Sequence, residues 1–331
     1  AYGVEVQLLH NLNIRNHARY GYHITAVWVQ FMTVGTLNED SLSVDQQLSV
    51  LDFNMTEADA LANDLKHLVA LLQRDKGIGT IADVVINHRR NVSSWTDFPA
   101  ETYNGVTYQM TYNDICSDDE AAKNGQKVGP NKDTGEGWDG MRDLDHMSEN
   151  VQTNVKAYLK FLLNDLGYTG FRYDMVKGYS AEYTKMYNED SKPQFSVGEC
   201  WDSSNTIKNW IEGTGKTSAA FDFQFRYTVR NAANNGDWTQ LGKQNEGNWP
   251  LVSAKNESGS YRQYAVTFVE NHDTEKRADA DQDPLKKDTL AANAYLLAMP
   301  GTPCVFLTHW KAYRQEIANM ITVRKAVGIT N

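Results

Sequence analysis

Carboxylates, histidines and an arginine end four short segments that are rich in β-branched and aromatic residues. Such runs are typical of buried parallel strands whose carboxyl ends open into a site. Neighbouring carboxyl groups, one ionised and one protonated, can supply a nucleophile and a general acid, which is what hydrolysis of a glycosidic bond needs. The segments are Asp83–His88 (DVVINH), Gly170–Lys177 (GFRYDMVK), Val197–Trp201 (VGECW) and Phe268–Asp273 (FVENHD).

Arg172 and Asp174 stand two residues apart on a predicted strand, so both side chains point to the same side. An arginine beside an aspartate lowers the pKa of the carboxyl group and keeps it ionised, as a nucleophile must be. A simple ion pair at a strand end would give the same pattern.

Glu199 ends the next predicted strand and precedes Cys200 and Trp201. Apolar and aromatic surroundings raise the pKa of a carboxyl group, which would suit a general acid. A solvated glutamate at a strand end fits this position equally well.

His272 and Asp273 end a later predicted strand, and His88 ends an earlier one. Asp273 could stabilise positive charge on a sugar ring, while the two histidines could donate hydrogen bonds to its hydroxyls. Each histidine taken singly also fits a structural role. If all these strand ends face one funnel, the side chains converge.

Asn87 lies next to His88, so on a strand its side chain would be expected to point away from that of His88. With Asp133 and Asp143 it could supply oxygen ligands to a hard cation, of which Ca²⁺ is the natural choice. Solvated turns rich in aspartate would look the same.

Strand-like and helical stretches alternate from residue 57 onward, which predicts an α/β fold with parallel strands. Six strands follow Gly79, and Val4–Leu8 and Thr25–Gln30 would complete a (β/α)8 TIM barrel. A turn-rich stretch interrupts this order after the third strand. We therefore predict a barrel formed by residues 1–87 and 144–331, with an irregular inserted domain at 88–143.

The formal net charge of −10 argues against a nucleic-acid partner, and no apolar run approaches the length of a membrane span. The 8 Trp and 17 Tyr would suit stacking against sugars. Cys200 and Cys304 lie in strand-like runs and are expected to be buried free thiols. We expect a monomer with a secreted or periplasmic location.

The four segments resemble the signature regions of the α-amylase family of retaining glycoside hydrolases, and Arg142–Asp145 (RDLD) resembles a fifth. The resemblance implies Asp174 as nucleophile, Glu199 as acid/base and Asp273 as transition-state stabiliser. These would perform endo-hydrolysis of α-1,4-glucans by double displacement, with paired carboxyl groups about 5 Å apart. The substrate-binding residues that it implies are His88, Arg172, Lys177, Trp201 and His272.

The resemblance also implies a Ca²⁺ ion between the barrel and the inserted domain. Its ligands would be Asn87, Asp143 and the backbone carbonyl of Gly178, together with Asp133.

The chain departs from the family pattern in three respects. Residues 30–56 contain no Gly-Tyr-x-Pro segment, the first predicted barrel unit is short, and the sequence stops at Asn331, right after the last predicted barrel helix. We therefore expect an atypical N-terminal segment and no C-terminal antiparallel β domain.

Four other functions are compatible with parts of this pattern. An α-glucosidase or a transglycosylase of the same family would keep the same catalytic residues. A catalytically impaired carbohydrate-binding barrel would normally lose a carboxylate, whereas all three remain here. A metal-dependent hydrolase with histidine ligands finds little support, because no two histidines have ligand spacing on one strand or helix.

Overall fold

The computed structural model describes residues 5–10, 27–33, 66–73, 77–276 and 283–330, with side chains from residue 66 onward. It consists of two compact units. The N-terminal unit comprises His10–Val27 and Thr33–Ser196, and the C-terminal unit comprises Ala1–Leu9, Trp28–Met32 and Val197–Asn331. Residues 1–56 were predicted to complete the barrel, and of these the described part contains 5–10 and 27–33.

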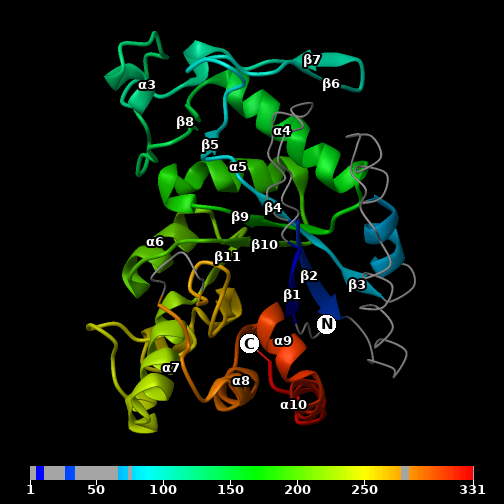
Figure 1. Ribbon diagram of the computed structural model, residues 1–331, viewed down its shortest axis with the longest axis vertical. Coiled ribbons are helices and arrows are strands. Elements are labelled where there is room, and N and C mark those ends of the chain that lie inside the picture. Colours follow the sequence, from blue (N-terminus) through cyan, green and yellow to red (C-terminus); the bar gives the residue numbers. More distant parts are fainter. Residues whose placement is uncertain (1–4, 11–26, 34–65, 74–76, 277–282, 331) are drawn as a thin grey trace. The chain divides into compact units, whose positions relative to one another are not determined.

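The N-terminal unit is built around the parallel strands β4 (Ile81–Val84) and β9 (Gly170–Tyr173), in which Asp83 lies opposite Arg172. All four residues of β9 are buried. In Figure 1 the two strands lie next to each other, with the helices α4 and α5 beside them. A buried parallel pair of this kind holds its strand ends firmly.

The helix α4 (Glu149–Asn164) begins where its sequence predicts. The Ser148 side chain accepts the N–H of Val151 as an N-cap. Its apolar face is buried and packs towards the core and α5 (Ala181–Ser191). The fully buried members of that face are Val151, Val155 and Leu159.

The two ends of the turn-rich stretch after β4 lie side by side. The strands β5 (His88–Arg89) and β8 (Arg142–Asp143) pair antiparallel, with His88 opposite Asp143. The boundaries 88 and 143 of the inserted domain nevertheless stay a prediction. The short strand β3 (Ile78–Gly79) lies just before β4. Between β5 and β8 the chain forms β6 (Glu101–Tyr103), β7 (Val106–Tyr108), η2 (Tyr112–Asp114) and α3 (Glu120–Lys123).

The C-terminal unit carries a second set of parallel strands. Within it β10 pairs with β11, β11 with β12, β12 with β13, and β13 with β1. Helices follow these strands in turn, and α8 packs against both α7 and α10. The strands are β1 (Glu5–His10), β10 (Phe195–Gly198), β11 (Ala219–Phe221), β12 (Ala265–Thr267) and β13 (Thr302–Phe306), and the helices are α6 (Ser204–Gly213), α7 (Phe223–Asn235), α8 (Thr289–Ala298), α9 (Leu307–Ala312) and α10 (Arg314–Ala326).

One predicted element of the C-terminal unit was wrong in extent. The expected strand over residues 218–224 ends at Phe221, and α7 begins two residues later because the Asp222 side chain caps its first turn. The helix predicted from Tyr313 to about Val327 is confirmed as α10, and the separate helix α9 precedes it. The candidate strands Val4–Leu8 and Thr25–Gln30 correspond to β1 and to β2 (Val27–Thr33).

Two further expectations concern the chain as a whole. Cys116, Cys200 and Cys304 are all buried thiols that form no disulfide in the described structure, so the prediction for Cys200 and Cys304 is confirmed. In the described part of the chain no helix has both the length and the apolar character that crossing a membrane requires.

Candidate active site

Arg172 joins two carboxylates at the end of the β4–β9 pair. Its Nη1 lies 2.8 Å from Asp83 Oδ1 and 2.5 Å from Asp174 Oδ1. The Arg172 and Asp83 side chains are almost fully buried, whereas the Asp174 side chain is 24% exposed. Asp83 on β4 therefore holds the Arg172 guanidinium, and the guanidinium in turn fixes one oxygen of the Asp174 carboxylate. Solvent can still reach that carboxylate.

The backbone directly after Asp174 adopts an unusual conformation. Met175 has φ 43° and ψ 51°, in the left-handed region that is costly for residues other than glycine. The short helix η3 (Val176–Gly178) follows, and it places Lys177 so that its Nζ lies 2.9 Å from Glu136 Oε1. The chain therefore changes direction between Asp174 and Lys177.

His88 starts β5, four residues beyond the end of β4, and does not end the third strand as the sequence suggested. Its imidazole stacks on the Trp138 indole, with ring centroids 5.8 Å apart and planes at 17°. Burial lowers the pKa of His88, and the nearby Asp174 carboxylate opposes this in part. His88, Trp138 and Asp174 are thus neighbours in the N-terminal unit.

Asn87 and Gly178 approach each other closely. A Cβ added to Gly178 would collide with the Asn87 side-chain amide, so only glycine fits here. The Asn87 Nδ2 lies 3.5 Å from Asp143 Oδ1. The Asn87 Oδ1 is buried and has no hydrogen-bond partner among the described residues.

Asp143 is a buried carboxylate beside this amide, and the half-buried Asp133 lies close enough to Asp143 for the two charges to interact. Burial raises the pKa of Asp143 to about 7, with further contributions from Asp133 and Asp119, although the Trp138 N–H opposes the change. Burial likewise raises the pKa of Asp133, whose Oδ2 has no hydrogen-bond partner in the described structure. These oxygens are arranged in a way that a cation would stabilise.

A cluster of three His, Cys, Asp or Glu side chains suited to a metal is absent from the described residues. The set around Asn87 contains only two carboxylates, and its other oxygens belong to an amide and a backbone carbonyl. Calcium accepts all three types of oxygen.

Glu199 and Trp201 lie just beyond β10 in the C-terminal unit. Glu199 follows the last residue of that strand and is buried. The Trp201 indole stacks on Phe223 at 4.8 Å, and its Nε1–H donates to the Tyr227 hydroxyl at 2.6 Å. Because Trp201 is still 37% exposed, it presents a fixed aromatic surface.

His272 and Asp273 lie in a turn several residues beyond β12, which ends at Thr267. The His272 Nε2 lies 3.1 Å from Asp273 Oδ2. Asn271 Oδ1 closes the turn by accepting the backbone N–H groups of Asp273 and Thr274. The Asp273 backbone is therefore held by a side chain two residues earlier.

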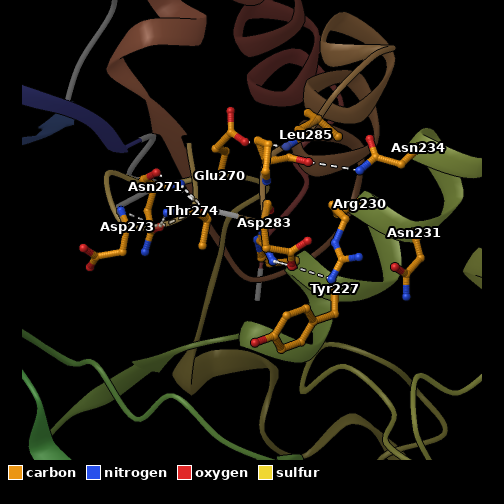
Figure 2. A network of polar contacts seen from close by, with 12 residues as sticks. Tyr227, Arg230, Asn231, Asn234, Glu270, Asn271, Asp273, Thr274, Asp283 and Leu285 are labelled. Carbon is orange, nitrogen blue, oxygen red and sulfur yellow. Dashed lines mark hydrogen bonds and ion pairs between the residues drawn. The ribbon is translucent and has the colours of Figure 1, made fainter. Parts of the chain in front are cut away.

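The base of this turn is anchored by Glu270. Its Oε1 accepts the Leu285 N–H at 2.5 Å and its Oε2 lies 2.9 Å from His309 Nε2. Figure 2 shows Glu270, Asn271, Asp273 and Thr274 on this turn, with Asp283 and Leu285 beside it. Asp283 pairs in turn with Arg230 of α7 at 2.5 Å.

The structure thus groups the predicted site residues within each unit. In the N-terminal unit it brings His88, Arg172 and Asp174 together, and Asn87 with Asp143, Asp133 and Gly178. In the C-terminal unit it describes Glu199 with Trp201 and His272 with Asp273. The roles of all these residues stay predictions, as does the spacing of Asp174 and Glu199.

The sequence reasoning missed Asp83 and Trp138 as members of the site. Asp83 begins the first motif, but its pairing with Arg172 depends on the register of two strands 89 residues apart in the chain. Trp138 stands in a stretch flanked by Gly137 and Gly140. A tryptophan in a glycine-rich turn was the only signal for it.

A family of known proteins matches the part of the chain that carries the four motif segments. A family model described as "Alpha amylase, catalytic domain" matches residues 53–309. "Probable alpha-amylase 2" of Arabidopsis thaliana is 31% identical over 280 residues, which is 79% of this chain and 64% of the relative. "Alpha-amylase 3, chloroplastic" of the same plant is 29% identical over 295 residues, 82% of this chain and 31% of the relative.

A bacterial relative matches a similar part of the chain. "Glucan 1,4-alpha-maltotetraohydrolase" of Stutzerimonas stutzeri is 28% identical over 281 residues, 76% of this chain and 46% of that protein. The chain therefore spans between 31% and 64% of the length of these three relatives. With the parallel strands and following helices of both units, the family match confirms the predicted α/β class and (β/α)8 barrel. This chain belongs to the family of α-amylase catalytic domains.

Proposed function

We propose that this chain hydrolyses internal α-1,4-glucosidic bonds of starch- or glycogen-like polysaccharides, with net retention of the anomeric configuration. Its family membership supports glycoside hydrolysis, and the names of its relatives point to α-glucans. The observation that carries the proposal is the Arg172 guanidinium between Asp83 and Asp174. It holds a solvent-accessible carboxylate at the end of a parallel strand pair.

In the proposed reaction Asp174 attacks the anomeric carbon and forms a covalent glycosyl intermediate. Arg172 would keep its carboxylate ionised and oriented. Glu199 would donate a proton to the leaving oxygen, and would then activate the water that releases the product. Its position supports this role, because Glu199 is buried directly after β10 and the strand would fix its carboxyl group.

Asp273 would stabilise the positive charge that develops on the sugar ring. The turn closed by Asn271 supports this, since it fixes the Asp273 backbone before substrate arrives. His88 and His272 would donate hydrogen bonds to sugar hydroxyls, while Lys177 and Trp201 would contact the neighbouring sugars.

We also propose that Ca²⁺ binds to Asn87, Asp133, Asp143 and the Gly178 carbonyl. Two buried oxygens without hydrogen-bond partners in the described structure support it, as does the raised pKa of Asp143. The residues present fit the ion, because Ca²⁺ takes carboxylate, amide and carbonyl oxygens. When bound, the ion would neutralise the two carboxylates and fix the inserted segment against Gly178.

The activity is tested by iodine–starch staining with analysis of the reducing-end products. Wild-type protein should release a spread of oligosaccharides whose initial products are α-anomers. Asp174→Asn should lower turnover by at least about 10³-fold while leaving the melting temperature unchanged. Asp139→Asn is the matched control, because Asp139 is exposed and its ion pair is with the likewise exposed Lys123.

The same assay separates the alternatives. Glucose as the only product would favour an α-glucosidase, and longer chains than those supplied would favour a transglycosylase. Sugar binding without turnover would indicate a catalytically impaired barrel. Unchanged turnover in Asp174→Asn would refute the assignment of the nucleophile.

A monomeric state and a secreted or periplasmic location remain proposals. Light scattering of the purified chain would test the first, and fractionation of producing cells the second.

A further inference from the structure

Trp138 is an exposed aromatic residue that the proposed mechanism does not yet use. It is 48% exposed, whereas Trp95 and Trp201 are each 37% exposed. An exposed indole presents a flat apolar face that a ligand of matching shape can cover. The faces of a glucose ring carry C–H groups that can cover such a surface.

The position of Trp138 is fixed by two separate contacts. Its indole stacks on His88, and its backbone N–H donates to Asp143 Oδ2 at 2.8 Å. Asp143 lies opposite His88 in the β5–β8 pair. The ring is therefore held in place before any ligand binds, which lowers the entropy cost of binding.

The residues before Trp138 lie along the same predicted sugar site. The Glu136 N–H donates to the Lys177 carbonyl at 2.9 Å, and the Glu136 carboxylate pairs with the Lys177 ammonium. Lys177 and His88 are both proposed to contact sugars. Residues 136–138 thus link Lys177, which Glu136 contacts, to His88, which the exposed Trp138 indole contacts.

We propose that Trp138 stacks on a glucosyl ring of the α-glucan chain, next to the sugar that His88 contacts. The indole would supply the apolar surface, and His88 and Lys177 would supply hydrogen bonds to the hydroxyls. This inference rests on the proposed function, since it extends the substrate site of the same enzyme. It makes Trp138 a binding residue with no part in bond cleavage.

The test measures maltoheptaose binding by calorimetry in an Asp174→Asn parent, in which turnover does not interfere. Adding Trp138→Leu should weaken binding about tenfold or more, because it removes the flat ring but keeps apolar volume. Trp138→Phe should restore most of the affinity, since it keeps an aromatic face. Melting temperatures of all variants would show that the fold is retained.

Trp95→Leu is the matched control. Trp95 lies in the same inserted segment and is 37% exposed, but its ring lies over the Arg142 guanidinium at 4.5 Å. It should leave maltoheptaose affinity unchanged. Equal binding by the parent and its Trp138→Leu variant would overturn this inference alone. Failure of the parent and of wild type to bind or cleave α-glucans would overturn the proposed function with it.

Discussion

His146 should make the stability of this protein depend on pH. The imidazole is 2% exposed, its Nε2 donates to the Ile86 carbonyl at 2.9 Å, and its Nδ1 accepts the Tyr187 hydroxyl at 2.7 Å. A proton added to Nδ1 would reverse the direction of the second bond and place a charge in the interior. Burial accordingly lowers the pKa of His146 from 6.5 to about 4.

The sign of the effect follows from proton binding. Because the folded-state pKa lies below the unfolded value, the unfolded chain binds more protons between pH 6.5 and about 4. The free energy of unfolding must therefore fall as the pH falls through this window. At about 1.4 kcal/mol per pH unit, the loss is about 2 kcal/mol by pH 5 and about 3 kcal/mol near pH 4.

The assay is urea unfolding of wild type and His146→Gln at pH 7, 6 and 5. A glutamine amide can still donate to the Ile86 carbonyl but does not titrate. The stability of wild type relative to the variant should fall by about 2 kcal/mol between pH 7 and pH 5. The carboxyl groups titrate in both proteins, so the difference in stability between wild type and His146→Gln isolates the effect of His146.

His67→Gln serves as the control, since His67 is exposed on the helical segment 66–73. Its pH dependence should match that of wild type. Parallel stability curves for wild type and His146→Gln would refute the reasoning.

Three further predictions concern the Gly178 region and the candidate site. Gly178→Ala should destabilise the protein by about 1–3 kcal/mol in urea unfolding, because the new methyl group meets Asn87, whereas Gly242→Ala has open space and should be nearly neutral. EDTA should lower the melting temperature of wild type, because a cation held only by the folded state at 100 times its Kd contributes about 2.7 kcal/mol; Asp143→Asn should lose this response, and a wild-type melting temperature indifferent to EDTA would count against the ion. Arg172→Lys should lower kcat about 10²-fold with little change in KM, since one ammonium cannot hold two carboxylates in the same geometry; steady-state kinetics with an unchanged kcat would contradict it.

The contrast between α4 and α7 explains what periodicity can predict. In α4 the apolar residues recur every three or four positions, and Ser148 marks the start, so period and cap agree. The start of α7 reads Phe-Gln-Phe-Arg-Tyr-Thr-Val, which alternates like a strand. The Asp222 cap and the packing of α7 against α8 and η4 (Trp238–Gly242) outweigh that local preference.

The residues of the candidate site likewise differ in how far the sequence could place them. Residues that follow a strand directly, such as Asp174 and Glu199, could be placed from the sequence because the strand sets their position. His88 and Asp273 could be named but not placed, since each lies beyond the regular part of its strand. Trp138 could not be found, because its contact with His88 depends on the path of a long loop that no period describes.

The proposed cation site and the proposed sugar-stacking surface share residues 133–138. Asp133 begins this segment with a buried oxygen that has no hydrogen-bond partner among the described residues, and Trp138 ends it by donating to Asp143. A cation that neutralises Asp133 and Asp143 would remove a repulsion acting on the backbone that carries the indole. Between them, Glu136 ties the segment to Lys177. On both proposals, the ligands that stabilise the inserted segment also position a sugar-binding ring, so stability and substrate affinity depend on the same few carboxylates.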